Sequence, residues 1–255
     1  MMHKCGPIDR RISLQGQSNA VGQGNVSDLS ATPLSANPDL AAFASQPFDR
    51  VYIYNNAAAA YQKLSIGTNN MANSATQFGP EFGIAVRWTR ETSKGRLFID
   101  KFGVNGQAIS LFQQGTSYWT NLAARMTAAN NWLASQGIKP VYAGWVWLQG
   151  ESDYAQTQAY YHDQLAAYIA SRISAGMDPG IGRRVLIQMS TASTMYGATV
   201  ASAKLAYAEA NPTTVDITTM PAYFNADNLH SSARGQLQMG YDAFSKLFSK
   251  PAKAA

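Results

Sequence analysis

Short apolar runs alternate along the chain with longer stretches in which apolar residues recur every three or four positions. Runs rich in Val, Ile, Leu and aromatic residues, bounded by Gly, Pro or Asn, are typical of buried β-strands. The strands predicted in this way span residues 11–14, 51–54, 96–101, 141–148, 185–189 and 215–218.

The stretches between these strands have the spacing of amphipathic helices. In residues 154–174, apolar side chains such as Tyr161, Leu165, Tyr168 and Ile173 fall mainly on one helical face. Helices are predicted at residues 80–92, 118–135, 154–174 and 199–210, with a last one after Ser232. Strands that alternate with helices of this length indicate βαβ units, so we expect an α/β fold with a mainly parallel sheet covered on both faces.

Two regions lack this periodicity. Residues 22–47 and 55–79 are rich in Asn, Ser, Ala, Gln and Gly. Loops of this length inside a compact domain are uncommon unless they serve function, for example as walls around a pocket. Since no internal repeat and no Pro-rich linker interrupts the chain, we predict a single domain over residues 1–255.

The composition agrees with a folded domain. Of 255 residues, 46% are hydrophobic and 14% are charged, which argues against disorder and against a coiled coil. The longest apolar run, around Trp145 and Trp147, is far shorter than the ~18 residues of a membrane-spanning helix. We therefore expect no contact with a membrane. A single cysteine, Cys5, excludes an intramolecular disulfide and a cysteine-based zinc site.

The charge gives little information about partners. Lys and Arg number 20 and Asp and Glu 15, for a net charge of +5 without a basic stripe. This pattern favours ordinary solubility over nucleic-acid binding. The first 11 residues lack the apolar stretch of a signal peptide, so we expect a cytoplasmic protein or a secreted one whose leader was removed. The sequence does not indicate an oligomeric state.

A serine follows the first predicted strand, in the segment LQGQSNA of residues 14–20. At the carboxyl end of a parallel strand, Ser18 would lie in the crevice where α/β sheets bind ligands. Serine is a weak nucleophile and needs a histidine base within hydrogen-bond distance. By itself Gly-x-Ser more often marks a turn or a helix N-cap. Ala20 also stands where the nucleophile elbow of α/β-hydrolases has its second glycine, which counts against that class.

A candidate base lies near the other end, in the segment NADNLH of residues 225–230. Asp227, three residues before His230, can accept the imidazole Nδ1–H within a tight loop and leave Nε2 free as the base. From the spacing alone, a capped turn before a helix is the more frequent outcome.

Polar residues also follow two other predicted strands. In the segment WVWLQGESD of residues 145–153, the two tryptophans are expected in the core. Glu151 and Asp153 could suggest a glycosidase pair, but residues two apart seldom flank a bond at the required ~5–9 Å. We expect Glu151 to anchor its loop by accepting backbone N–H bonds. In the segment FGVNGQAI of residues 102–109, glycine can bring an N–H close to a substrate oxygen, although a simple turn explains the segment equally well.

Together these segments resemble the SGNH-hydrolase superfamily, and within it the sialate O-acetylesterase type of carbohydrate esterase, which includes family 6 acetylxylan esterases. The matching blocks are GQSN at 16–19, FGPE at 78–81, NGQAI at 105–109, WLQGESD at 147–153 and DNLH at 227–230. They occur in the family's order over nearly the whole chain, and GQSN, WxQGE and DxxH in this order are highly specific.

The resemblance implies a three-layer α/β/α, flavodoxin-like fold. It implies Ser18 as nucleophile, His230 as general base and Asp227 as the carboxylate that orients the base. The oxyanion hole would combine the N–H groups of Ser18 and Gly106 with the side-chain amide of Gln149. No metal and no organic cofactor is implied.

One segment departs from the family pattern, which usually reads Gly-Gly followed by Thr or Ser near residue 105. Asn105 is therefore a rival of Gln149 as the amide donor, or a substrate contact. Gln17, Asn19 and Glu151 are expected to contact the substrate or to support the loops.

These features predict a serine esterase that removes O-acetyl groups from carbohydrates, of the acetylxylan or sialate type, through an acyl-enzyme on Ser18. The amide-rich loops suit an acetylated sugar or polysaccharide better than a lipid. Aromatic candidates for sugar stacking are Tyr118, Trp119, Tyr196, Tyr223 and Phe224. Two alternatives stay open: a broad short-chain carboxylesterase or lipase of the same superfamily, and a non-catalytic carbohydrate-binding module. The joint presence of Ser18, Asp227 and His230 speaks against the module, which needs none of them.

Overall fold

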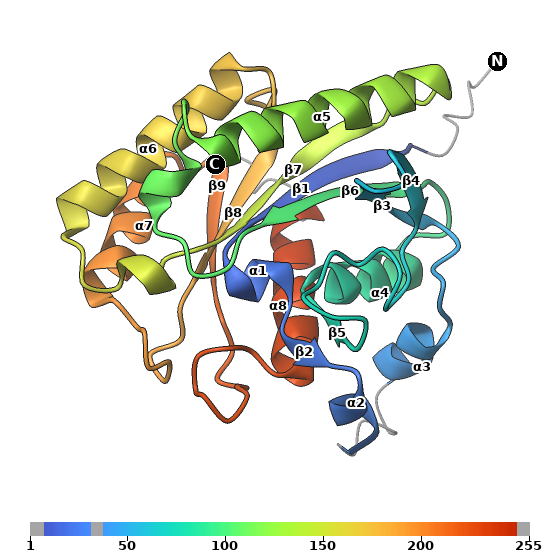
Figure 1. Ribbon diagram of the computed structural model, residues 1–255, viewed down its shortest axis with the longest axis horizontal. Helices are drawn as coiled ribbons and strands as arrows, with labels where there is room; N and C mark the ends of the chain where they lie inside the picture. The colour runs from blue at the N-terminus through green and yellow to red at the C-terminus, as the bar shows by residue number, and fades with distance from the viewer. Residues whose placement is uncertain (1–7, 32–37, 249–255) are drawn as a thin grey trace, which may run out of the picture.

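A mainly parallel sheet forms the middle layer of the molecule, and helices cover both of its faces (Figure 1). The structure is a computed structural model that describes residues 8–31 and 38–248. Every neighbouring pair in the seven-stranded sheet is parallel except β3 with β4. The predicted three-layer α/β/α fold is therefore confirmed.

The strands of the sheet are β1 (Arg10–Gly16), β3 (Val51–Asn55), β4 (Ala60–Lys63), β6 (Leu97–Gly103), β7 (Val141–Leu148), β8 (Arg183–Gln188) and β9 (Val215–Thr219). The helices are α1 (Ser18–Val21), α2 (Ser27–Ala31), α3 (Pro38–Ala44), α4 (Glu81–Glu91), α5 (Ser117–Ser135), α6 (Gln158–Ser174), α7 (Ala198–Ala210) and α8 (Ala233–Phe248). Two 3₁₀ turns are η2 (Ile109–Phe112) and η3 (Glu151–Asp153). The short strands β2 (Gly24–Asn25) and β5 (Gln77–Phe78) pair separately.

The strand order places three loops side by side. Across the sheet the order is β4-β3-β6-β1-β7-β8-β9, so the chain builds β3 and β6 on one side of β1 and then crosses to β7 on the other. Ligands of open α/β sheets bind outside the carboxyl ends of the strands, at the point where the strand order reverses direction in this way. The loops after β1, β6 and β7 begin at this point, and they carry Ser18, Asn105 and Gln149.

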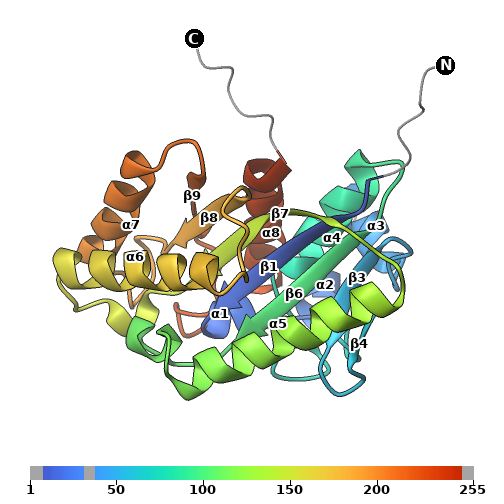
Figure 2. The same cartoon turned by 90° about the horizontal axis from the view of Figure 1, so that it is seen from above.

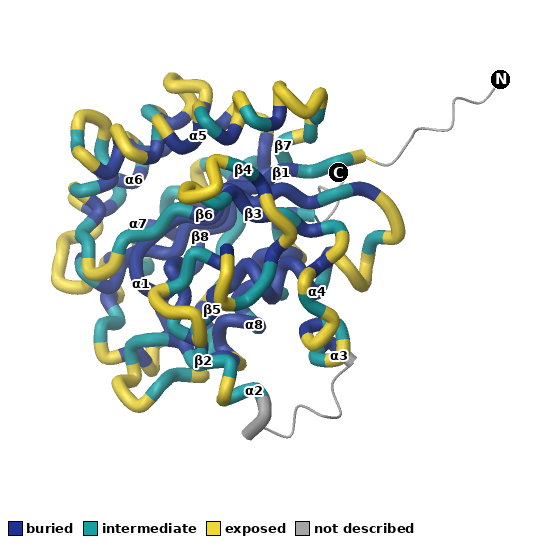
Figure 3. The backbone as a smooth tube through the Cα atoms, turned by 45° about the vertical axis from the view of Figure 1, so that its right-hand side comes forward, coloured by how far each residue is buried: buried dark blue, intermediate teal, exposed yellow. Residues whose placement is uncertain are grey.

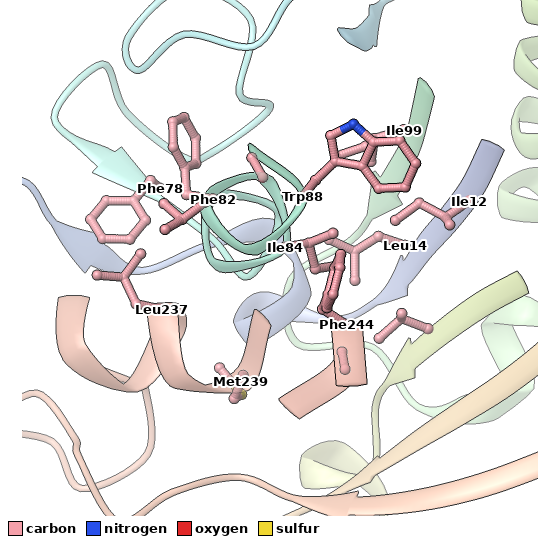
Figure 4. Packing of buried hydrophobic residues seen from close by; sticks show 14 of the residues in the cluster. Ile12, Leu14, Phe78, Phe82, Ile84, Trp88, Ile99, Leu237, Met239 and Phe244 are labelled. Carbon is pink, nitrogen blue, oxygen red and sulfur yellow. The ribbon is translucent and has the colours of Figure 1, made fainter. Parts of the chain in front are cut away.

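Successive side chains of a strand point to opposite faces, so each central strand contributes to two cores. Ile12 and Leu14 of β1 pack on the face covered by α4 and α8 (Figure 4). Trp145 and Trp147 of β7 are fully buried on the other face, their ring centroids 5.2 Å apart. Both tryptophans therefore have the core position expected from the sequence.

Helices α4 and α8 cover one face of the sheet, and α5, α6 and α7 cover the other (Figure 2). Burial follows the same division, because the strands are buried and the outer faces of the helices are exposed (Figure 3). The predicted apolar face of α6 points inward at Tyr161, Leu165 and Tyr168, whereas Ile173 in its last turn is exposed. None of the described helices is long and apolar enough to cross a membrane.

The predicted elements are present, with bounds within about two residues for every strand. The helix predicted at 154–174 begins later, at Gln158, because the Thr157 side chain accepts the Tyr160 N–H and caps it there. The region 22–47 is not one long loop, since it contains α2 and α3. The edge strand β4, which pairs antiparallel with β3, was not predicted either.

Candidate active site

A sharp turn between β1 and α1 positions Ser18. Gly16 has φ = 145°, and a Cβ at this position would lie 1.8 Å from the Leu148 carbonyl oxygen, so a larger residue does not fit. Gln17 donates its N–H to the same carbonyl at 2.9 Å. Ser18 is then the first residue of α1, where backbone N–H groups lack an intrahelical acceptor.

The imidazole of His230 lies between Ser18 and Asp227. Its Nε2 is 3.0 Å from the Ser18 Oγ, and its Nδ1 is 2.6 Å from the Asp227 Oδ2. The second carboxylate oxygen of Asp227 accepts the backbone N–H groups of Leu229 and His230, both at 2.9 Å. The three side chains that the sequence singled out are thus hydrogen-bonded in series.

Asp227 is held in its ionised form. Partial burial alone would raise the pKa of this carboxyl, but hydrogen bonds from the His230 and Leu229 N–H groups and from the imidazole outweigh burial and lower the pKa below its usual value. The carboxylate can therefore accept the Nδ1–H of His230 throughout the neutral range, which orients Nε2 toward Ser18.

Asn19 connects the histidine loop to the ends of the central strands. Its Oδ1 accepts the Ser231 N–H at 2.8 Å, and its Nδ2 donates to the Leu229 carbonyl at 3.2 Å and to Glu151 Oε1 at 2.9 Å. One amide side chain therefore holds the residues on both sides of His230. This is loop support, one of the two roles considered for Asn19.

Glu151 is buried at the floor of the site, 2% exposed. Burial raises the pKa of its carboxyl, while the hydrogen bond from Asn19 and the charge of Lys204 oppose the rise. We expected Glu151 to anchor its own loop through backbone N–H groups. Because η3 brings the carboxylate against Asn19, the anchor also reaches the histidine loop.

A pocket of about 350 Å³ opens onto these groups. Its lining comes from five separate segments of the chain and consists of Gln17, Ser18, Gln23, Asn105, Gly106, Glu151, Ser152, Met195, Leu229 and His230. Amide and hydroxyl side chains predominate, and in the described part of the chain no Lys or Arg contributes to the lining. Of the two long loops expected to form walls, 22–47 contributes Gln23 to the lining, whereas 55–79 contributes none of its described residues.

Gly106 presents its backbone to the pocket. Its φ of 62° lies in the left-handed region, and no atom lies within 4 Å of the position that a Cβ would take. Among the described residues, the backbone N–H groups of Ser18 and Gly106 have no hydrogen-bond acceptor. The neighbouring Asn105 also lines the pocket, and its Nδ2 donates to Asn73 Oδ1 at 2.9 Å. The loop 55–79 thus supports the site through Asn73.

Gln149 does not reach the pocket. Its side chain is buried, and its Nε2 donates to Asp153 Oδ2, to the Gln107 carbonyl at 3.1 Å and to Gln17 Oε1 at 3.3 Å. The Tyr161 hydroxyl donates to its Oε1 at 2.8 Å. A primary amide has two N–H donors, so these acceptors leave none for an oxyanion. The expected donor instead joins the loops after β6 and β7, because η3 places Asp153 against it.

We expect Gln149→Ala to lower the free energy of unfolding by about 2–4 kcal/mol, because it leaves Asp153 and Tyr161 with fewer partners in the buried interior. Thermal or urea unfolding measures this change. Gln114→Ala, at an exposed glutamine, is the matched control and should stay within ~0.5 kcal/mol of the wild type. A stable Gln149→Ala variant whose kcat falls ~10²-fold with unchanged KM would instead identify an oxyanion donor.

Other residues lie differently from the sequence-based expectations. Tyr118 and Trp119, considered as sugar platforms, lie in the first turn of α5 and are buried in the core. Tyr223 is exposed, and the Arg234 guanidinium lies 4.0 Å from the centroid of its ring. The sequence analysis did not identify Lys204 of α7, although it lies in an apolar stripe four residues after Val200.

Within residues 8–31 and 38–248, no group of three or more His, Cys, Asp or Glu side chains could hold a metal ion.

Fold and site together define a class of protein. A three-layer α/β/α fold with a serine, a histidine and an aspartate in series at the carboxyl edge of the sheet is the arrangement of SGNH hydrolases. The chain belongs to the carbohydrate esterase family described as sialic acid-specific acetylesterase, whose sequence model matches residues 12–249. It is therefore a carbohydrate esterase of the SGNH type.

Solved structures agree with this fold. A protein from Arabidopsis thaliana has a TM-score of 0.71 at 18% identity, with 96% of this chain and 100% of that chain covered. NanS has a TM-score of 0.58 at 14% identity, with coverages of 94% and 96%. A carbohydrate acetylesterase from Xanthomonas citri has a TM-score of 0.56 at 15% identity, and 95% of this chain aligns with 57% of that longer chain. At these identities the likeness shows the fold alone. A search of curated proteins finds no match.

Proposed function

We propose that the chain is a serine esterase that removes O-acetyl groups from carbohydrates through an acyl-enzyme on Ser18. The observation that carries the proposal is the series Asp227–His230–Ser18, with distances of 2.6 and 3.0 Å, at the edge of an amide-lined pocket. Nucleophile, base and orienting carboxylate have the mutual geometry that acyl transfer requires.

In the first half of the reaction, the Ser18 Oγ attacks the acetyl carbonyl carbon while His230 Nε2 takes the hydroxyl proton. The carbonyl oxygen becomes an oxyanion, to which the free N–H groups of Ser18 and Gly106 donate. The imidazolium then protonates the sugar oxygen, the ester C–O bond breaks, and the acetyl group remains on Ser18. Asp227 stabilises the imidazolium during this step.

In the second half, water replaces the sugar. His230 takes a proton from the water, the resulting oxygen attacks the acetyl carbon, and the bond to Ser18 breaks as the imidazolium returns the proton to Oγ. Acetate leaves. We assign to Gln149 and Asn19 the support of this geometry, since the first holds the Gln107 carbonyl beside Gly106 and the second holds the loop of His230.

The pocket favours a small acyl group on a polar alcohol. Among its described lining residues, Met195 and Leu229 are the two with aliphatic side chains, and the other side chains carry an amide, a hydroxyl, a carboxyl or the His230 imidazole. We expect aryl acetate to be hydrolysed much faster than aryl butyrate, with octanoate the slowest, in a comparison of kcat/KM at one pH. Similar rates across the three chain lengths would favour the broad carboxylesterase or lipase instead.

The charge around the pocket favours a neutral sugar over an anionic one. Glu151 lines the pocket, Asp227 lies behind His230, and no cationic Lys or Arg from the described chain joins the lining. A substrate carboxylate in this field is repelled, and the repulsion weakens as salt screens it.

We therefore expect O-acetylated sialic acid to be hydrolysed with about tenfold lower kcat/KM than its 1-carboxamide at low ionic strength. The two substrates have nearly the same shape and differ in the charge and hydrogen-bonding groups at this one carbon, and a gap due to charge should shrink as salt is added. Met195→Lys adds a cation to the lining and should narrow the difference in kcat/KM between the two substrates. The neutral Met195→Gln should leave this difference unchanged. Equal or faster hydrolysis of the free acid by the wild type contradicts this expectation.

A further inference from the structure

Lys204 is a buried cation directly beneath the proposed site. It lies on the inward face of α7 and is 1% exposed. Its Nζ donates to the Ile187 carbonyl at 2.8 Å and to the Gln149 carbonyl. Ile187 lies near the end of β8 and Gln149 directly follows the neighbouring strand β7, so one ammonium joins the two strand ends from which site loops begin.

Two buried carboxylates follow on η3, directly after Gly150, and Lys204 Nζ lies 3.3 Å from the position that a Cβ of Gly150 would take. Glu151 and Asp153 are 2% and 1% exposed, and one oxygen of each, Glu151 Oε2 and Asp153 Oδ1, has no hydrogen-bond partner among the described residues. A buried carboxylate without compensation takes up a proton instead of staying charged. A positive charge next to the cluster therefore favours the ionised form of Glu151.

The groups packed around the cluster have the corresponding titration shifts. Burial lowers the pKa of Lys204 to about 8, although the charges of Glu151 and Asp153 oppose the change. Burial raises the pKa of both carboxyls. Hydrogen bonds, chiefly from Asn19 to Glu151 and from Gln149 to Asp153, oppose that rise, and the charge of Lys204 opposes it further in each. From the other elements, the Tyr161 ring of α6 lies 5.8 Å from Nζ, and His230 acts on Glu151 from the pocket side.

We propose that Lys204 is a positioning residue for this reaction, in that its charge keeps Glu151 ionised so that Glu151 holds Asn19, and Asn19 holds the loop of His230. The inference rests on the proposed serine-esterase function. Lys204 acts on Glu151 through its charge, without a direct ion pair. The later links are contacts: Glu151 Oε1 accepts from Asn19 Nδ2 at 2.9 Å, and Asn19 binds the residues on both sides of His230. A hydrogen bond to an ionised carboxylate is about twice as strong as one to a neutral acceptor, so protonation of Glu151 loosens the chain of contacts.

Loss of the Lys204 charge should consequently appear in the pH profile. In Lys204→Gln, an amide N–H can still donate to the strand-end carbonyls, but the positive charge is gone. Glu151 then takes up its proton at a higher pH, and the acid limb of kcat/KM for an aryl acetate should move up by about one pH unit or more. Lys139→Gln, at an exposed lysine, is the control and should leave the acid limb of kcat/KM where it is in the wild type.

The double variant Lys204→Gln/Glu151→Gln separates this chain of contacts from a general effect of Lys204. With a neutral glutamine at position 151 there is no carboxyl to titrate, so removal of the lysine charge should no longer move the acid limb relative to Glu151→Gln alone. A shift of the same size in both backgrounds would overturn the proposal, because Lys204 would then act on His230 without Glu151.

A second measurement uses the wild type, in case the Lys204 variants do not fold. The infrared difference spectrum between wild type and Glu151→Gln at pH 7 should contain the bands of a carboxylate and lack that of a protonated carboxyl. A protonated Glu151 at pH 7 overturns the proposal. This measurement does not depend on Ser18. If the proposed serine-esterase function is wrong, Ser18→Ala will hydrolyse the ester fully, whatever the ionisation state of Glu151.

Discussion

Replacement of Ser18 by alanine is expected to lower kcat/KM for acetyl esters by ~10⁴-fold or more, because it removes the one oxygen that can form the acyl-enzyme. The change removes a single side-chain atom whose hydrogen-bond partner is His230. The fold should therefore remain, with a melting temperature close to that of the wild type. Hydrolysis of an aryl acetate, with thermal unfolding measured in parallel, tests both parts.

Ser152→Ala is the matched control. Ser152 lines the same pocket but does not belong to the hydrogen-bonded series Asp227–His230–Ser18. This variant should retain most of the activity. Phenylmethylsulfonyl fluoride should modify Ser18 in the wild type and leave Ser18→Ala unlabelled, as read by mass spectrometry. Full activity of Ser18→Ala would refute the acyl-enzyme. A wild type that binds acetylated sugars without hydrolysing any acetyl ester would instead be the carbohydrate-binding module.

The central sheet could be predicted because buried parallel strands are nearly continuous apolar runs, and Val141–Leu148 is one of them. The edge strand β4 carries no such signal. Its sequence AYQK contains one large apolar residue, Tyr61, and the strand forms because β3 offers an antiparallel partner. Pairing of this kind depends on the tertiary arrangement, which a local pattern does not contain.

The candidate site was predictable to the extent that it depends on strand ends. Ser18 and Gly106 follow strands that are neighbours in the sheet, so their approach follows from topology. The environment of Gln149 does not, because it depends on the 3₁₀ turn that brings Asp153 under the strand end. Tyr118 and Trp119 could be either sugar platforms or core residues from the sequence, and only the position of α5 over the sheet places them in the core.

Lys204 marks the limit of reading sites from motifs. No short motif surrounds it, and its partners are two backbone carbonyls, which every residue possesses. Its only local signal is a charged residue within an apolar stripe of α7. A buried cation of this kind can be connected to the site only when the neighbouring strand ends and the carboxylates of η3 are seen together.

The second large effect is expected at His230. His230→Ala should lower kcat/KM nearly as much as Ser18→Ala, because nucleophile and base act as a unit and either loss disables it. His162→Ala is the matched control: this side chain lies on α6, contacts Asp163 at the surface, and should change the free energy of unfolding by less than ~0.5 kcal/mol with no change in rate.

The pH profile of the wild type should identify the same residue. Only the neutral imidazole can accept the Ser18 proton, so kcat/KM should rise with pH as His230 deprotonates. Because the pKa of Asp227 is held below its usual value, that carboxylate is already ionised over this range and does not produce the rise. Asp227→Asn should reduce the rate by a smaller factor than His230→Ala, since Asp227 orients the ring without reacting. A flat profile between about pH 5 and 8, or an active His230→Ala, would show that another group is the base.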